Sequence, residues 1–498
     1  MSGKIWDWVI IGAGLGGLIS AGLLKSRFPD RSVVILESHT DIGGCAGCFE
    51  RSVELAGYDS KQRVRFDVGA TTLSALGEGQ SLRRVLNELG IELPASLADP
   101  GLRVVMRNGS IVHRHANADE WYRESTRHFG ERSIELWRVL SSIEQDSWKL
   151  LRHFPTFPPA SFSDAFALIR PQALIGITAL RNTARPFANL LQDLHLEDNK
   201  PLIEFIDQLL LVSTQTSSRS VSVIGAALGL IYPSQTYYVD GGAYALSAEL
   251  LKRYLSLGGE MRFKQRVEHV NVGKNFELST TRGDIFQARQ VISNATLWDT
   301  REMLDRDRAA SKYFHKWDAV RTGDDVWGAN AYYAIVGDEV GGSAIFHQLH
   351  TDDGGSIFVS LSRIGDSLKA PSGYRTLTAS THETDPDRWF RMTRSDYEIE
   401  KKRLRARFER ILRTSLEGFG EHAPQFDLVG TPLTFEFYTR RRSGLVGGLA
   451  YKAGRMPWHW PSPVSPVEGL FLVGDTIFPG QSAGAVAHCA TSLISRFS

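Results

Sequence analysis

The chain has 498 residues, of which 42% are hydrophobic, and a formal net charge of +1. This length predicts about three domains or two large interleaved ones. The balanced charge argues against a nucleic-acid partner, which would require a basic surface. The three cysteines, Cys45, Cys48 and Cys489, are too few for a disulfide framework and favour a reducing compartment.

No segment predicts export or a membrane span. Met1 to Trp6, which precede the first expected strand, are too few for a signal peptide. A transmembrane helix needs roughly 18 consecutive apolar residues, whereas the longest candidate, Val221 to Ile231, is shorter and contains two glycines. We therefore expect a cytoplasmic protein whose contact with a membrane, where there is one, is peripheral.

The start of the chain predicts a strand–helix–strand unit. A strand at Trp8–Ile11 leads through a glycine-rich turn into a helix that ends near Arg27, and a second strand follows at Val33–Glu37. The next expected helix is Leu82–Leu89, whose apolar residues recur at helical spacing, with Ser81 as N-cap and a glycine at its end.

The turn after the first strand, Gly12-Ala13-Gly14-Leu15-Gly16-Gly17, has the spacing of a dinucleotide-binding fingerprint. Gly12 allows the tight turn, Gly14 lets the backbone approach a pyrophosphate, and Gly17 lets helix and strand pack closely. Backbone N–H groups at the helix N-terminus then bind the phosphates. The turn therefore predicts a dinucleotide cofactor.

The second strand indicates which dinucleotide is bound. It ends at Glu37, twenty residues after Gly17, where a carboxylate accepts a ribose hydroxyl. An acid without an arginine beside it favours a ribose that carries no 2′-phosphate. A further glycine pair in Asp41-Ile42-Gly43-Gly44 offers a second close backbone approach, which suits an extended dinucleotide such as FAD better than NAD.

Later elements alternate between helical and extended stretches. Residues 121–216 are expected to be mainly helical, and Gly241-Gly242 open another helix. Ser395–Leu416 predicts a long helix with a capping box formed by Ser395 and Glu398. The expected strands are Met261–Val267, Phe276–Thr280, Ile285–Gln287, Val291–Ser293, Ala331–Val336, Ile357–Ser362, Arg375–Thr381 and Leu470–Val473. A helix at Ala483–Ile494 is expected after the last of them.

Several segments resemble the flavin amine oxidase and phytoene desaturase superfamily. They are Asp7–Gly17, Val33–Gly44, Phe66–Thr72 and Leu472–Gly484. Within the superfamily the similarity is greatest to carotenoid desaturases and isomerases, and especially to carotenoid 3′,4′-desaturases. The segments that carry this narrower resemblance are Phe66–Thr72, Tyr438–Arg440, Gly444–Gly448 and Phe478–Gly484.

The resemblance implies an α/β fold with two lobes. One lobe is a Rossmann-like FAD-binding domain, and the other is a mixed-sheet substrate domain with a helical lid. The FAD-binding parts would be 1–95, 236–300 and 441–498. Residues 96–235 would form a helical and sheet region for the substrate and its lid, and residues 301–440 a substrate domain of sheet and helix.

The resemblance also implies which residues contact FAD. Val267 would hold the adenine through its backbone, Asp475 would lie near the ribitol and pyrophosphate, and the helix from about Ala483 would point its N-terminus at the flavin ring. Cys45 departs from the superfamily, which often has an arginine there. The full set is Gly12, Ala13, Gly14, Leu15, Gly17, Glu37, Ser38, Gly43, Gly44, Cys45, Ala70, Thr71, Thr72, Val267, Gly474, Asp475, Ser482 and Ala483.

The expected reaction is dehydrogenation of a carotenoid-like polyene, in which a hydride moves to flavin N5 and a proton leaves the adjacent carbon. A hydrocarbon would be bound through its buried apolar surface, at roughly 0.8 kcal/mol per CH₂. No base can be assigned, and Glu436 and Tyr438 are guesses. The alternatives are a carotenoid cis–trans isomerase, a saturase, an amine oxidase and a non-catalytic prenyl-binding escort protein of the same fold.

Four other patterns allow a functional and a structural interpretation. Cys45–Cys48 forms a CxxC, which we interpret as loop residues, and no metal is expected. Gly480–Gly484 matches GxSxG, but no acid follows it, which argues against a hydrolase. Arg440–Arg442 is interpreted as a solvated loop. The apolar stretch Phe154–Leu190 is interpreted as core, as a lid over the substrate or as a membrane-dipping segment.

Overall fold

The first strand of the chain, β1 (Ile5–Ile11), lies inside a seven-stranded sheet, as its apolar sequence predicts. The computed structural model describes residues 4–154, 173–304, 313–315, 317, 325–351 and 354–497. The strands run in the order β10-β11-β12-β1-β2-β9, with β19 beside β12. Their bounds are β2 Val33–Leu36, β9 Glu260–Arg262, β10 Val267–Asn271, β11 Phe276–Thr280, β12 Ile285–Ser293 and β19 Leu470–Leu472.

This sheet is assembled from three stretches of the chain that lie far apart in sequence. β1 pairs in parallel with both β2 and β12, and β12 pairs in parallel with β19 near the C-terminus. The helices that pack around it are α1 (Leu15–Arg27), α2 (Ser81–Leu89), α10 (Ala243–Ser256) and α15 (Ala483–Ile494). α1 is buried along most of its length because its small and aliphatic residues lie between neighbours on several sides.

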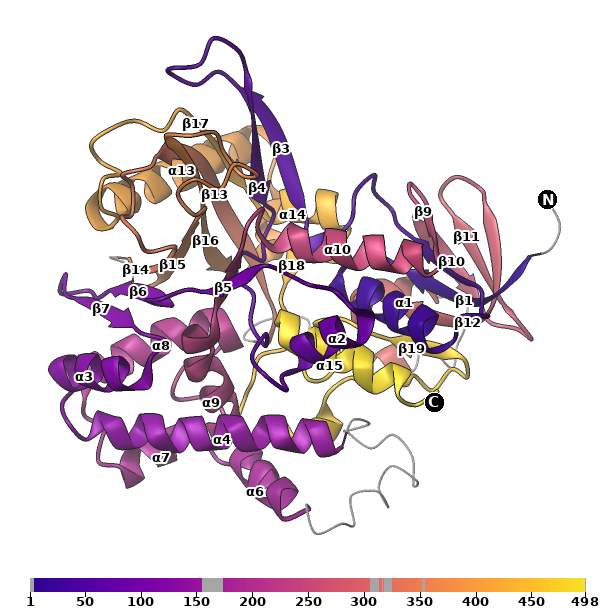
Figure 1. The fold of residues 1–498 in the computed structure, drawn as a ribbon, viewed down its shortest axis with the longest axis horizontal. Helices are drawn as coiled ribbons and strands as arrows, with labels where there is room; N and C mark the ends of the chain where they lie inside the picture. The colour runs from indigo at the N-terminus through magenta and orange to yellow at the C-terminus, as the bar shows by residue number, and fades with distance from the viewer. Residues whose placement is uncertain are drawn as a thin grey trace.

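A second sheet, mixed in strand direction, lies beside the first (Figure 1). Its order is β17-β13-β16-β15-β14-β6-β7, with β18 beside β13, and only the β14–β6 pair in it is parallel among the described strands. The bounds are β6 Leu102–Val105, β7 Ile111–Arg114, β13 Trp327–Gly337, β14 Phe346–His350, β15 Ser356–Leu361, β16 Tyr374–Glu383, β17 Phe426–Gly430 and β18 Leu445–Val446. The apolar stripe of α13 (Arg394–Ser415) packs on one face of this sheet.

The described residues between 118 and 231, which are 118–154 and 173–231, are mainly helical, as expected, and lie below the second sheet in Figure 1. Its helices are α3 Ala118–Phe129, α4 Ser133–His153, α6 Ala173–Ala184, α7 Phe187–Asp193, α8 Lys200–Thr214 and α9 Val223–Ile231. Part of the apolar stretch Phe154–Leu190 lies outside the described residues. Among the helices that are described, none has the length and apolar character needed to cross a bilayer.

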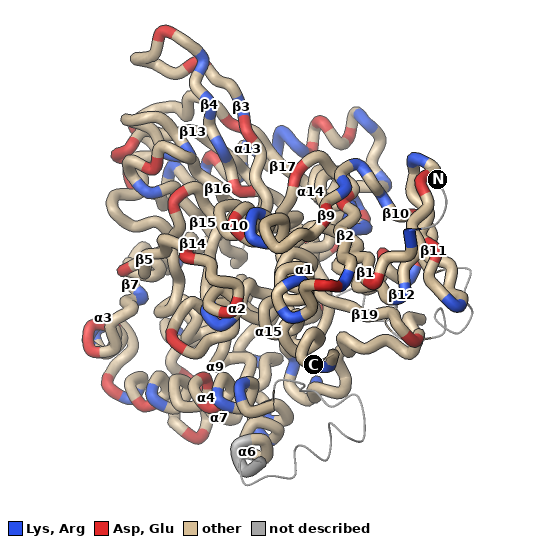
Figure 2. Tube along the Cα trace, turned by 45° about the vertical axis from the view of Figure 1, so that its right-hand side comes forward, with Lys and Arg blue, Asp and Glu red and all other residues tan. Residues whose placement is uncertain are grey.

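Two short ribbons and two short helices complete the described fold. The antiparallel hairpin of β3 (Cys48–Val53) and β4 (Gln62–Asp67) projects from the body of the molecule (Figure 1). The second ribbon pairs β5 (Ala95–Leu97) with β8 (Tyr237–Val239), and the helices are α11 (Leu297–Met303) and α14 (Pro432–Thr439). Lys and Arg are interspersed with Asp and Glu over the molecule (Figure 2), in keeping with the small net charge.

Several element boundaries differ from the sequence-based expectation. α2 begins at Ser81 itself, so Gln80 is its N-cap, and the Ser81 hydroxyl donates instead to the carbonyl of Gly484 at 2.6 Å. α13 begins earlier than predicted, and Thr393 rather than Ser395 accepts from a backbone N–H, that of Asp396. Any of several adjacent residues at a helix N-terminus can satisfy the first free N–H groups, so the observed cap lies one or two residues from the predicted one.

The strands near Val267 were also expected differently. Residues 261–267 do not form one strand, because β9 ends at Arg262 and Val267 begins β10. Conversely, Ile285–Gln287 and Val291–Ser293 are two ends of the continuous strand β12. That strand pairs with β11 along its first half and with β19 along its last residues, which explains why its sequence changes character midway.

Candidate functional site

A cavity of about 1280 Å³ opens between the first sheet, the second sheet and the helical region. Four groups of elements line it: the carboxyl ends of β1 and β2, the N-terminus of α15, one face of β13, β15 and β16, and helices α4 and α9. Pockets for small ligands are commonly about 300–1,000 Å³. This cavity is therefore large enough for a long ligand beside a cofactor.

Two glycine turns meet at the β1 end of the cavity. Gly14 and Gly43 form an isolated bridge, and the N–H of Gly43 donates to the carbonyl of Ala13 at 2.8 Å. A Cβ on Gly14 would lie 2.6 Å from Nδ2 of Asn294, and Gly44 has a positive φ of 56°. The absence of side chains leaves a backbone-lined cradle at the N-terminus of α1, which fits a pyrophosphate.

Gly17 packs the helix against the strand rather than facing the cavity. A Cβ at Gly17 would lie only 2.1 Å from the carbonyl oxygen of Gly12. Such a contact is impossible for any larger residue, so the third glycine of the motif is required for the approach of α1 to β1. This is the packing role that the sequence predicts.

Glu37 follows β2 and is buried at the edge of the cavity. Its Oε2 accepts from the N–H of Ala13 at 2.8 Å, while Oε1 accepts from the N–H of His39 at 2.8 Å and from the Ser38 hydroxyl at 3.0 Å. Val267, at the start of β10, lines the same end of the cavity. The carboxylate is thus held in one orientation beside the glycine cradle, as a ribose-binding acid requires.

Most of the predicted site residues come together in this single cavity, from the two glycine turns to the loop 70–72 and α15. Ala13, Gly17 and Glu436 do not line it. The Glu436 carboxylate instead accepts from the N–H of Ser443 at 2.6 Å, which fixes a loop, so we do not retain it as a base. Tyr438 lies at the outer edge beside His39 and is 52% exposed.

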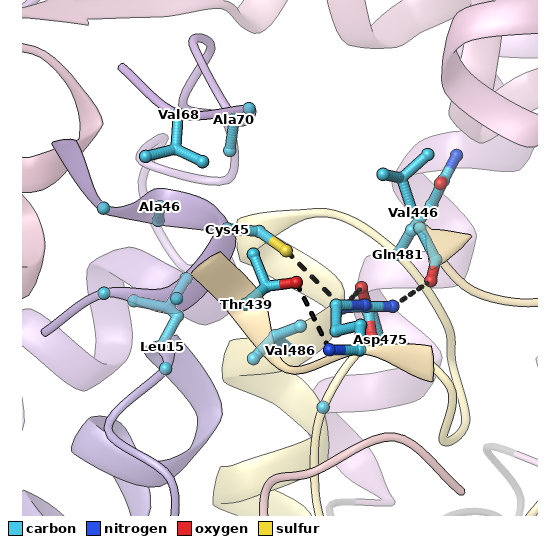
Figure 3. Close-up of a pocket in the computed structure, with 18 of the residues that line it drawn as sticks. Leu15, Cys45, Ala46, Val68, Ala70, Thr439, Val446, Asp475, Gln481 and Val486 are labelled. Carbon is cyan, nitrogen blue, oxygen red and sulfur yellow. Dashed lines mark hydrogen bonds and ion pairs between the residues drawn. The ribbon is translucent and has the colours of Figure 1, made fainter. Parts of the chain in front are cut away.

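The arginine loop 440–442 is not uniformly solvated, contrary to the sequence interpretation. The Arg441 side chain is only 13% exposed and lies in the wall of the cavity, where Nη1 lies 2.8 Å from Asp475 Oδ2 and 3.6 Å from Cys45 Sγ. Nη2 donates to the carbonyl of Gly447 at 2.8 Å. Figure 3 shows Cys45 and Asp475 approaching the same point from opposite sides. The Asp475 carboxylate beside it raises the pKa of Arg441 despite burial, so the guanidinium stays charged.

Neither thiol of the CxxC is bonded to the other in the structure. Both are free, and burial raises the pKa of Cys45 as well as that of Cys48, which reaches about 12. A high thiol pKa leaves little thiolate at neutral pH. The pair therefore has the character of loop residues, as the sequence analysis expects.

Helix α15 begins at the cavity wall. The Ser482 side chain caps it by accepting from the N–H of Ala485 at 3.1 Å. Trp148 of α4 reaches this first turn, since a Cβ on Gly484 would lie 3.5 Å from its ring. The cap leaves the positive end of the helix dipole directed into the cavity, where it would stabilise negative charge.

A polar cluster on the helical side of the cavity was not predicted from the sequence. Glu144 of α4 accepts through Oε1 from Trp148 Nε1 at 2.5 Å and from Gln235 Nε2 at 3.3 Å. Gln235 in turn accepts from Gln80, and Tyr232 donates to Thr72. The signal in the sequence is a glutamate at helical spacing from Leu140, Trp148 and Leu151.

The comparisons with known proteins agree with this geometry. Residues 10–89 match the family model of an NAD(P)-binding Rossmann-like domain. Chloroplastic prolycopene isomerase from Arabidopsis thaliana is 24% identical, and the match spans 97% of this chain and 81% of the relative. For the human all-trans-retinol 13,14-reductase the identity is 23% over 98% and 86%. For the lycopene-forming phytoene desaturase of Pantoea ananas it is 26% over 64% and 61%.

Solved structures show the same fold at lower identity. Putrescine oxidase bound to putrescine superimposes with a TM-score of 0.64 and 15% identity, over 99% of both chains. Its likeness extends over both lobes and therefore supports the α/β architecture of two lobes as a whole.

Proposed function

Since the chain belongs to the carotenoid desaturase and isomerase family of the flavin amine oxidase superfamily, we propose that it desaturates a long apolar polyene of the carotenoid class with FAD as its cofactor. The observation that carries the proposal is the continuous cavity, which joins the glycine cradle and Glu37 to a chamber between the second sheet and helices α4 and α9. A single cavity could thus hold both a dinucleotide and an elongated substrate.

The residues of the cradle are proposed to hold the cofactor. The glycine turns would bind the pyrophosphate, Glu37 the ribose, and Asp475 with Ser482 and Ala483 the flavin half. Bound FAD supplies a two-electron acceptor for hydride. The protein contributes orientation and the exclusion of water.

The chamber beyond the cradle suits an apolar chain. Its walls include Leu151, Leu228, Phe358 and Leu428, and a hydrocarbon held there would gain roughly 0.8 kcal/mol per buried CH₂. Gly225 and Gly229 of α9 also border it, and Gly229 packs tightly against α8, because a Cβ there would lie 2.5 Å from the Ser213 hydroxyl. These apolar walls offer a long polyene the contact surface that its binding requires.

A carotenoid cis–trans isomerase is the second candidate. The match to prolycopene isomerase spans 97% of this chain, whereas the match to phytoene desaturase spans 64% of it. A saturase is also kept, because the chain is similar to retinol 13,14-reductase over 98% of its length. One arrangement of cofactor and apolar substrate in this cavity would serve all three activities.

The proposal includes a cytoplasmic location with peripheral membrane contact, since a carotenoid partitions into lipid. Two exposed apolar side chains support it: Ile177 of α6, which is 63% exposed, and Trp458, which is 60% exposed. The loop before Trp458 is tied to α6, because the N–H of Gly454 donates to the carbonyl of Thr183 at 3.1 Å. Flotation with lipid vesicles would test this contact, and full recovery away from the vesicles would contradict it.

The test of the function is co-expression with acyclic carotenoids, followed by mass analysis of the extracted pigments. A product lighter by two hydrogens with a red-shifted spectrum would establish the desaturase. An unchanged mass with altered retention would establish the isomerase, and a product heavier by two hydrogens the saturase. No change in any pigment, with FAD bound, would overturn the carotenoid assignment.

A further inference from the structure

Glu144 is a buried acid in the wall of the cavity that no binding role accounts for. It lies on α4 and is 5% exposed. Its Oε1 is fixed by the indole N–H of Trp148 and by the amide of Gln235. The amide of Gln235 is held in turn by Gln80, whose own Oε1 accepts from the N–H of Gly77 at 2.8 Å. The carboxyl group is therefore held rigidly.

The second oxygen of this carboxyl group is free for a ligand. Oε1 takes both of the hydrogen bonds that Glu144 makes with described residues, and Oε2 takes none of them. Since the side chain lines the cavity, Oε2 is the atom available to whatever occupies it. A carboxylate held in place with one oxygen open to the cavity is positioned to accept a proton from a ligand that comes within hydrogen-bond reach.

The other acids that line the described cavity are either engaged elsewhere or exposed. Glu37 is held at the glycine cradle, Asp475 is paired with Arg441, and Asp299 accepts from Thr296 and Arg442. Asp41 accepts from Tyr244, Glu302 pairs with Arg442, and Glu268 lies exposed beside Val267 on β10. Glu144 is thus the acid on the α4 and α9 side, where the wall is mainly apolar.

Glu144 also lies close to where the reaction is expected. One helical turn along α4, Trp148 contacts the first turn of α15. The N-terminus of α15 is the part of the cavity to which the resemblance assigns the flavin ring. The Glu144 side chain therefore lines a part of the cavity close to that helix end.

We propose that Glu144 is the catalytic base of the reaction, an inference that rests on the proposed desaturation. Two C–H bonds of the substrate break and one C=C bond forms. The hydrogen on one carbon leaves with its electron pair, so that the substrate is oxidised and FAD is reduced by two electrons. The hydrogen on the adjacent carbon leaves as a proton and bonds to Oε2 of the Glu144 carboxylate.

The surroundings of Glu144 favour this role. Burial in the apolar wall raises the pKa of its carboxyl group, although the hydrogen bonds from Trp148 and Gln235 lower it in part. A raised pKa makes the carboxylate a better proton acceptor than an exposed one. The rate should accordingly rise with pH as Glu144 ionises.

The decisive experiment follows reduction of the bound flavin by a polyene under anaerobic conditions, in the purified holoenzyme. We expect Glu144→Gln to retain FAD and to bind the polyene, but to reduce the flavin at least about 100-fold more slowly, within the range of general-base catalysis. Glu144→Asp should recover part of the rate. Glu135→Gln, on an exposed position of the same helix, is the matched control and should match the wild type.

The pH profile separates a catalytic role from a structural one. The ionisation seen in the wild-type rate should vanish in Glu144→Gln. Gln235→Leu removes a hydrogen bond that lowers the pKa of Glu144, so it should move that ionisation to higher pH. Because Gln235→Leu keeps Glu144 in place, the shift of the ionisation in this variant tests the role of Glu144 even if Glu144→Gln does not fold.

The outcomes distinguish the inference from the function on which it rests. If the Glu144→Gln variant reduces its flavin within about threefold of the wild-type rate and with the same pH profile, the role of Glu144 is overturned, while the proposed function stands. An ionisation that Gln235→Leu does not move would also overturn it. If no polyene reduces the wild-type flavin, the proposed function fails and the inference falls with it.

Discussion

The guanidinium of Arg441 lies 2.8 Å from the carboxylate of Asp475, although 34 residues separate them along the chain. The same guanidinium lies 3.6 Å from the sulfur of Cys45, which follows the paired glycines of the second loop. The resemblance noted in the sequence implies an arginine at the place of Cys45 in many related proteins. In this chain the positive charge of Arg441 reaches the same place from the loop that follows α14. The Nε of Arg441 has no hydrogen-bond partner among the described residues.

Arg441→Met should therefore weaken the binding of FAD. Hydrogen bonds to charged groups contribute about 1.5–3 kcal/mol, so the dissociation constant of FAD should rise by roughly 10- to 100-fold. The ratio of flavin to protein after purification, and titration of FAD into the stripped protein, measure this. The exposed Arg442→Met is the control. Cys45→Arg in the Arg441→Met background should restore part of the affinity, and unchanged FAD content in Arg441→Met would contradict the expectation.

Gly14→Ala should impair the cofactor cradle. The added Cβ would lie 2.6 Å from Asn294 Nδ2, so either the Asn294 side chain or the turn must move. We expect a loss of about 1–3 kcal/mol in stability together with a lower flavin content, measured by thermal unfolding and by absorbance. Gly273→Ala is the matched control, because its Cβ would only approach Asn275 at 3.4 Å. Equal behaviour of the two variants would refute this account of the cradle.

Lys369→Met should destabilise the protein through Asp67. Lys369 Nζ lies 2.7 Å from Asp67 Oδ2, and both side chains are almost completely buried. Removing one partner leaves an uncompensated buried charge, which costs about 3–5 kcal/mol. Urea unfolding of Lys369→Met and of the double variant Asp67→Leu/Lys369→Met would measure it. The double variant should be the more stable of the two, and the opposite order would exclude a buried charge as the cause.

The cysteines should resist alkylation in the folded protein. Burial raises the pKa of Cys48 to about 12 and also raises that of Cys45 and Cys489, so thiolate, the reactive form, is scarce at pH 8. We expect slow reaction with iodoacetamide in buffer and rapid reaction of all three after unfolding. Fast labelling of Cys48 in the native state would instead support a reactive dithiol.

The features that the sequence predicted well are those that local chemistry dictates. The Gly12–Gly17 turn, the end of β2 before Glu37 and the apolar stripe of α13 follow from spacing alone. The helix at Ala483–Ile494 was predicted to the residue. Each of these is determined by neighbours within a few turns or strands, and a short window of sequence therefore suffices.

What the sequence could not reveal depends on contacts between distant segments. Arg441 looked like a member of a solvated arginine triplet, and only its pairing with Asp475 shows that it is buried. Glu144 received no role from the sequence, because its hydrogen-bond partner Gln235 lies 91 residues away along the chain. Caps such as Gln80 and Thr393 were also misplaced, because several adjacent residues can fill that position equally well.

The interleaving of the first sheet has a consequence for biosynthesis. β1 and α1 leave the ribosome early, but β12 follows more than halfway along the chain, and β19 and α15 come last. The exposed edge of β1 must therefore wait, shielded by other contacts or by chaperones, until nearly the whole polypeptide has been made. Acquisition of the yellow cofactor would then mark the end of translation, so the colour of nascent chains would report completed assembly.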